Sequence, residues 1–273
     1  MNPTTVSDLA LRGAQGRVGA AISQASARTG VDFTYLFNQA RIESSLNPNA
    51  RARTSSATGL YQFIEQTWLG TVRRHGAAHG MGWAANAIQR SPNGRYHVAD
   101  PETRRAILDL RRNPEASAAM AAEFASDNGE YLEARLSRPA QSVDLYLAHF
   151  LGAGGAARFL RAHDANPGGA AASALPAAAR ANRWVFYNRD GSPRSFAEIR
   201  ERFAARIGGS GPASPARRTM PDVQMTALDS TARLAALDPN IVLGVGKADP
   251  TASVNAEYAR IAYLMLAGMG GAE

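Results

Sequence analysis

The sequence has no cysteine, a single lysine and no apolar run of membrane-spanning length. The absence of cysteine excludes disulfides, cysteine–zinc sites and thiol nucleophiles. A membrane helix needs about 20 consecutive apolar residues, so no membrane span is expected. Residues 1–30 also lack the apolar stretch of a signal peptide, and no standard export route is expected from them.

Positive charge is in excess, with a net charge of +7, and Lys247 is the one basic residue that is not arginine. Residues 209–273 hold five basic and six acidic side chains, so residues 1–208 carry about +8. Such a surface suits an anionic partner, either a nucleic acid, membrane headgroups or a cell-wall polymer. A coding bias towards arginine explains the choice of Arg over Lys but not the excess over acidic residues.

Abundant alanine and long apolar segments favour helices, and neither a strong strand pattern nor an internal repeat is visible. Residues 76–100 contain Gly, Asn and Pro and are expected to be irregular. Residues 163–194 are rich in Ala, Gly and Pro, and a turn is expected at residues 188–191. Ser7 is a candidate cap of the first helix, and Phe33 is expected on the apolar face of the second. The predicted helices span about residues 5–28, 60–68, 101–110, 114–136, 142–151 and 195–207. Another begins at Asp32 or Thr34 and ends before Asn47, and a further one carries Phe159 and Leu160.

The composition therefore predicts an all-α or predominantly α chain with one large domain, residues 1–207. Residues 208–230 have the composition of a linker. Residues 231–273 are expected to form a flexible tail with one short apolar helix, a possible contact for a protein partner.

Residues 41–63 combine the features of a sugar-cleaving site. Glu43 is expected in the last turn of a helix, at the edge of an apolar face. A carboxyl partly removed from water favours its protonated form, which a glycosidase acid requires. A small polar loop follows, and residues 60–63 then offer an aromatic ring and an amide for sugar binding.

This segment resembles the soluble lytic transglycosylase family. The family motif is a catalytic Glu-Ser, an Asn-Pro pair, a small polar loop and Gly-Leu-X-Gln. The matching residues are Glu43-Ser44, Asn47-Pro48, Thr54-Ser55-Ser56 and Gly59-Leu60-Tyr61-Gln62.

The transglycosylase domain of large-phage endolysins is similar over a longer stretch. Its sequence matches residues 52–59, with lysine at the position of Arg53, and residues 144–150 and 186–193. Where most of the wider family has Ala-Tyr-Asn-Ala-Gly, this chain has residues 148–152, Ala-His-Phe-Leu-Gly. The family tyrosine hydrogen-bonds the catalytic glutamate, so the resemblance implies this role for Tyr146 or His149, with Tyr146 favoured. The substrate-binding residues that it implies are Thr54, Ser55, Ser56, Tyr61, Gln62, Glu123 and His149.

The resemblance implies a lysozyme-like fold and a reaction without metal or cofactor. Glu43 would act first as acid and then as base on the bond between N-acetylmuramic acid and N-acetylglucosamine, leaving 1,6-anhydro ends. The substrate would be peptidoglycan in the periplasm or cell wall, reached by phage-type release or specialised secretion.

Three other functions are compatible with parts of the sequence. A hydrolytic muramidase on the same fold and a non-catalytic wall-binding assembly protein are the alternatives. Charge alone would suggest a nucleic-acid-binding protein, which is not expected here. His75 and His79 lack a third ligand for zinc, and the arginines at 104–105 and 111–112 are expected on a solvated face.

Overall fold

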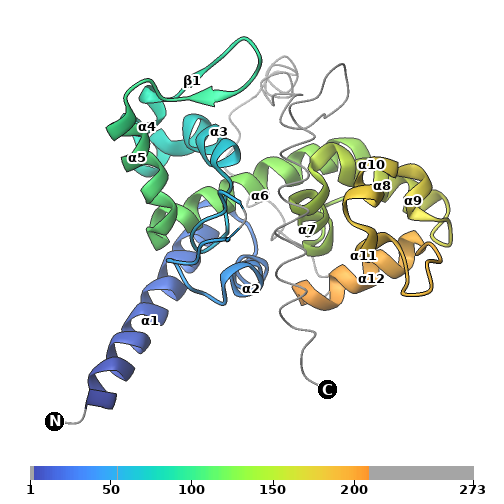
Figure 1. Cartoon of the computed structure of the whole chain (residues 1–273), viewed down its shortest axis with the longest axis horizontal. Helices are drawn as coiled ribbons and strands as arrows, with labels where there is room; N and C mark the ends of the chain where they lie inside the picture. Colours follow the sequence, from blue (N-terminus) through green and yellow to red (C-terminus); the bar gives the residue numbers. More distant parts are fainter. Residues whose placement is uncertain (1–2, 54, 209–273) are drawn as a thin grey trace, which may run out of the picture. The chain divides into compact units, whose positions relative to one another are not determined.

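The computed structural model describes residues 3–53 and 55–208, and this part of the chain is mainly α-helical, as the sequence predicts (Figure 1). It divides into two compact units, one ending at Phe124 and the other beginning at Ala125. The boundary falls within one helix, α6. Except for Gly208, the predicted linker and tail lie outside the described residues.

The first unit contains mostly helices and one short hairpin, in which Gln89 pairs with His97 and Arg90 with Tyr96. This hairpin is the only sheet among the residues described. The elements of the unit, in chain order, are α1 (Pro3–Thr29), α2 (Phe33–Ser44), α3 (Glu65–His75), η1 (Gly76–His79), α4 (Gly82–Ala87), β1 (Gln89–Arg90), β2 (Tyr96–His97), α5 (Pro101–Asp109), η2 (Leu110–Arg112) and the first part of α6 (Pro114–Leu136).

Side-chain caps fix where α2 and α5 begin. The Asp32 carboxylate accepts a hydrogen bond from the Tyr35 N–H at 2.8 Å, and Asp100 accepts one from the Thr103 N–H at 2.7 Å. Each bond satisfies an amide that has no partner within its own helix. Both predicted helices are confirmed, and so is the predicted span of α6.

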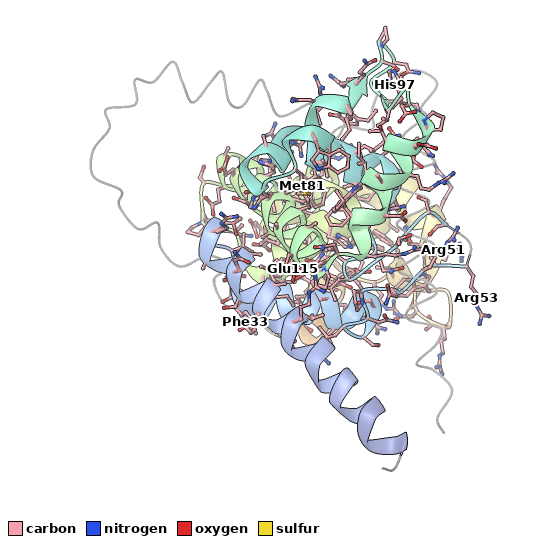
Figure 2. The ribbon with its side chains drawn as sticks, turned by 90° about the vertical axis from the view of Figure 1, so that its left-hand side faces the viewer. Phe33, Arg51, Arg53, Met81, His97 and Glu115 are labelled. Atoms are coloured by element: carbon pink, nitrogen blue, oxygen red, sulfur yellow. The ribbon has the colours of Figure 1, made fainter. Side chains whose placement is uncertain are left out.

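Four sequence expectations were wrong in this unit. The helix expected from Leu60 begins only at Glu65, and α1 begins at Pro3, so Ser7 lies inside the helix and not at its start. The irregular stretch 76–100 contains a 3-10 turn, a helix and the hairpin. Phe33 is 40% exposed and stacks on Phe37 at 5.8 Å between ring centroids, at the solvent edge of α2 (Figure 2).

Trp68 of α3 lies at the centre of the first unit's core and is fully buried. Its indole N–H donates to the Ile107 carbonyl at 2.8 Å, which joins α3 to α5. The Phe63 ring lies edge-on to Trp68 at 5.3 Å and to Phe124 at 6.3 Å. Aromatic packing of this kind fixes the segment that precedes α3 to the core.

The second unit is made mainly of helices, and α7 packs against both α8 and α12. The predicted helix over 142–151 and the capping box of Ser195 and Glu198 are confirmed. The elements are the remainder of α6, α7 (Ser142–Leu151), α8 (Ala153–Ala165), α9 (Ala171–Ala174), α10 (Pro176–Ala181), α11 (Arg183–Phe186) and α12 (Phe196–Ile207).

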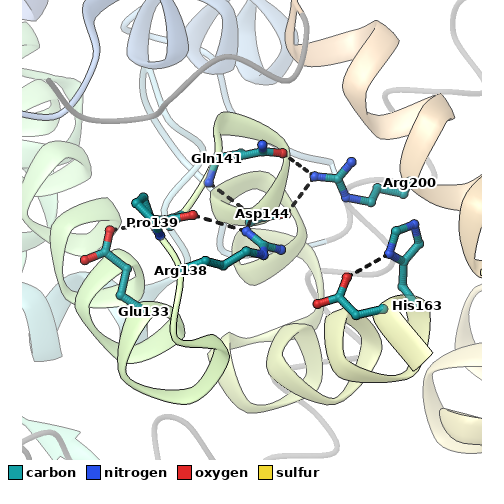
Figure 3. A network of polar contacts seen from close by, with 9 residues as sticks. Glu133, Arg138, Pro139, Gln141, Asp144, His163 and Arg200 are labelled. Atoms are coloured by element: carbon teal, nitrogen blue, oxygen red, sulfur yellow. Dashed lines mark hydrogen bonds and ion pairs between the residues drawn. The ribbon is translucent and has the colours of Figure 1, made fainter. Parts of the chain in front are cut away.

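A buried carboxylate joins α7 to α12 within this unit (Figure 3). Asp144 is fully buried, and its oxygens accept hydrogen bonds from Arg138 at 2.6 Å, from the Gln141 N–H at 3.0 Å and from Arg200 at 3.3 Å. Two cations therefore compensate one buried anion, as a charge in a protein interior requires. The network fixes the N-terminus of α7, the helix that carries Tyr146 and His149.

Candidate active site

Glu43 lies in the last turn of α2 and is only 7% exposed. It shares the buried face of the helix with Leu36, Gln39 and Ala40, which recur at the three- and four-residue spacing of one helical face. The carboxyl is thus on the core-facing side of α2, whereas the sequence predicts it at the edge of the apolar face. A carboxyl in this position is shielded from bulk water while it stays at the end of an element.

The chain reverses directly after Glu43 because two consecutive residues adopt left-handed backbone angles. Ser45 has φ 54° and Leu46 has φ 63°. The Ser45 N–H caps the helix by bonding to the carbonyls of Ala40 and Arg41. Ser44 Oγ lies 2.8 Å from the Leu60 carbonyl, so the residue next to Glu43 is tied to the following turn.

The loop after α2 is closed by short antiparallel bridges between Arg51 and Thr58 and between Thr58 and Phe63. Gln62, with φ 47°, fits its side chain inside this loop. Its amide nitrogen donates to the Gly59 carbonyl at 2.8 Å and to the Ala50 carbonyl at 3.2 Å. The amide that was expected to bind sugar therefore braces the loop, and its role towards substrate stays a prediction.

Tyr61 is a core residue, 1% exposed. Its hydroxyl donates to the Leu36 carbonyl at 3.1 Å, and burial raises the pKa of the phenol, which stays neutral. A ring buried to this extent has no face open to a sugar, so the structure does not support the stacking role expected from the sequence. Tyr61 joins the turn to the middle of α2.

Ser55 and Ser56 are half-buried and hold the loop from within. Ser55 Oγ accepts a hydrogen bond from the Ala57 N–H at 3.3 Å, and Ser56 Oγ accepts one from the Glu65 N–H at 3.3 Å, at the start of α3. Thr54 lies outside the described residues. Whether these hydroxyls also bind substrate stays a prediction.

Arg111 corrects an expectation, because it is buried, 8% exposed, where a solvated arginine was predicted. Its guanidinium donates to the Ser56 carbonyl at 2.8 Å and to the Phe63 carbonyl at 3.1 Å. Gly59 packs on its backbone so closely that an added Cβ would lie 1.8 Å from the Arg111 carbonyl oxygen. The sequence around Arg111 does not indicate that the side chain is buried, because its carbonyl partners lie 55 and 48 residues earlier in the chain.

Glu123 lies on α6 in the first unit, with a side chain 20% exposed. His79 Nε2 is 2.6 Å from one of its carboxylate oxygens, and His75 Nδ1 is 3.3 Å from the other. The sequence suggested all three residues separately and did not predict that they meet. Within residues 3–53 and 55–208, no group of three or more His, Cys, Asp and Glu side chains is arranged to hold a metal ion.

In the second unit, Tyr146 and His149 lie one turn apart on α7, and their rings stack at 6.1 Å between centroids. Tyr146 is 7% exposed and also meets Phe203 of α12 edge-on at 5.5 Å. The two candidates for one catalytic role therefore contact each other. Their rings are held by α12 packing and by the Asp144 network at the start of their helix.

The described part of the chain is mainly helical, with a glutamate buried at a helix end and a braced polar loop after it, and this is consistent with the lysozyme-like class of fold. The transglycosylase SLT domain family matches residues 20–142 of the chain. The protein therefore contains a lytic transglycosylase domain and is an enzyme of the kind that degrades cell-wall peptidoglycan. No helix in the described part has the length and apolar character that a membrane span requires.

The contact between Gly59 and Arg111 gives a testable stability difference. Gly59→Ala should lower the free energy of unfolding by roughly 2–5 kcal/mol, because a Cβ meets a backbone oxygen and φ is +85°. Gly80→Ala is the matched control, since φ there is +74° but an added Cβ would meet no neighbouring atom within 4 Å. Its free energy of unfolding should fall by only about 1 kcal/mol. Urea unfolding of both variants makes the comparison, and equal losses would contradict the close contact.

Proposed function

We propose that Glu43 is the single acid and base of a lytic transglycosylase that cleaves the β-1,4 bond between N-acetylmuramic acid and N-acetylglucosamine. The observation that carries the proposal is the position of Glu43, buried on the core face of α2 and one residue before the link from Ser44 to Leu60. The family match supports the reaction class and the polymer. The single-glutamate mechanism and the anhydro product go beyond that match.

The proposed reaction needs one carboxyl and no water. Glu43 gives its proton to the glycosidic oxygen, the bond to muramoyl C1 breaks, and the glucosamine chain leaves with a hydroxyl. The acetamido oxygen of the substrate can stabilise the positive charge at C1. The Glu43 carboxylate then takes the proton of the muramoyl 6-hydroxyl, O6 bonds to C1, and the 1,6-anhydro ring closes with Glu43 protonated again.

The polar loop after α2 is suited to an anionic wall polymer. Arg51 and Arg53 are both exposed on it, and Figure 2 shows Arg53 pointing away from the ribbon. Peptidoglycan carries carboxylates on its lactyl-linked peptides, so exposed guanidinium groups on the loop after α2 favour binding. The enzyme would act in the periplasm or cell wall, and a partner role for residues 231–273 stays a prediction outside the described residues.

Glu43→Gln is expected to fold and to lose activity by about 10⁴-fold, the upper range for general acid–base catalysis, because one group serves both steps. Gln keeps the shape of the side chain. Glu102→Gln, an exposed carboxylate of α5, is the matched control and should clear purified peptidoglycan at the wild-type rate. Wild-type clearing by Glu43→Gln, with both variants folded by circular dichroism, would refute the assignment.

The products separate a lyase from a hydrolytic muramidase on the same fold. We expect released muropeptides with anhydro ends, because O6 of the muramoyl residue replaces water as the nucleophile. Mass spectrometry detects each such product at a mass lower by one water than the corresponding reducing sugar. Products with reducing ends only would leave Glu43 in place and establish hydrolysis, and no released product would favour a non-catalytic wall-binding protein.

Tyr146 is proposed as the hydrogen-bond partner of Glu43, with His149 as the alternative. Tyr146→Phe keeps the ring that packs on His149 and Phe203 and removes only the hydroxyl. Loss of one hydrogen bond to a charged group predicts a fall in kcat of about 10- to 100-fold with little change in melting temperature. If Tyr146→Phe keeps full turnover and His149→Gln loses it, the role belongs to His149.

A further inference from the structure

Arg111 is a buried cation whose environment differs from that of its neighbour. Arg112 follows it in η2 with a side chain 43% exposed, 3.5 Å from Asp109. Arg111 is 8% exposed, and burial lowers its pKa to about 10, an effect that the charge of Glu65 partly offsets. It therefore remains charged at neutral pH in a place where a charge is costly.

The contacts of Arg111 explain what the buried charge does. Its Nη1 donates to the carbonyls of Ser56 and Phe63, and its Nε donates to the carbonyl of Leu108 in its own segment. Ser56 and Phe63 stand at the two ends of the turn that contains Gly59 and Gln62. A single guanidinium nitrogen thus holds both ends of this turn, while the arginine backbone supports its middle at Gly59.

The turn held by Arg111 is connected to the proposed catalytic group. Leu60, inside the turn, is linked through its carbonyl to the hydroxyl of Ser44, which follows Glu43 in the chain. The same turn is anchored to α2 a second time by the Tyr61 hydroxyl on the Leu36 carbonyl. A displacement of the turn would therefore reach α2 at two points, at Leu36 and at Ser44, the residue next to Glu43.

We propose that Arg111 is a positioning residue for glycan cleavage, which clamps residues 56–63 and thereby fixes the end of α2 that carries Glu43. The inference rests on the proposed function of Glu43. Arg111 itself touches backbone and not substrate, so it acts on the rate through the geometry of the site. A misplacement of about 1 Å at a reacting group can lower a rate by about 100-fold.

The test compares Arg111→Met and Arg111→Lys with Arg112→Met, which makes the same charge change one residue away. Assays run well below the lowest melting temperature, on soluble glycan strands, so that all variants are folded. We expect Arg111→Met to lose about 100-fold in kcat with KM changed by less than threefold. Arg111→Lys should lose about tenfold, because one ammonium cannot replace the planar fork, and Arg112→Met should stay within twofold of wild type.

Equal turnover of Arg111→Met and Arg112→Met would overturn the proposal, as would a loss confined to KM. If Arg111→Met does not fold, Arg111→Lys decides, and wild-type kcat in that variant would exclude a positioning role. Hydrogen exchange of the Thr58 and Gly59 amides, both bonded within the loop, reads the clamp without any reaction. If the amides exchange faster in Arg111→Lys but the wild type does not cleave glycan, the proposed function is refuted and the structural role of Arg111 stands. Unchanged exchange rates would refute the clamp.

Discussion

Gly59 lies against the carbonyl of Arg111 so closely that no side chain fits between them. This contact brings the 3-10 turn η2 under the loop that follows α2, and the guanidinium then reaches both ends of that loop. The loop in turn meets α2 through Ser44 and Tyr61. Much of the site's geometry depends on this one approach of two backbone segments, about 50 residues apart in sequence.

The polar groups of the loop are directed mainly at the protein itself. Gln62, Ser55 and Ser56 each use side-chain atoms for bonds to nearby backbone. Buried polar groups must be satisfied, and these described loop residues satisfy theirs within the protein. Such a loop suits catalysis because little ordering remains to be done when a polymer binds.

The sequence predicted the helices whose ends carry caps or prolines, such as α2, α5, α6 and α12, because those signals are local. It also placed Glu43 at a helix end and grouped it with the loop and Gln62. It failed at residues 60–64, because an apolar run in a buried turn has the composition of a helix start. It failed at Arg111 because burial of an arginine depends on carbonyls that only the fold brings together. The contact of Glu123 with His75 and His79 depends in the same way on packing across the unit.

The clamp on the loop uses carbonyl oxygens, which every residue type possesses. Side chains that point outward from the loop, such as Arg51 and Arg53, take no part in it. Their identity can therefore change in evolution or in the laboratory without disturbing the position of the loop. The residues that keep the loop in shape are thus distinct from the exposed arginines for which a contact with the wall polymer is proposed.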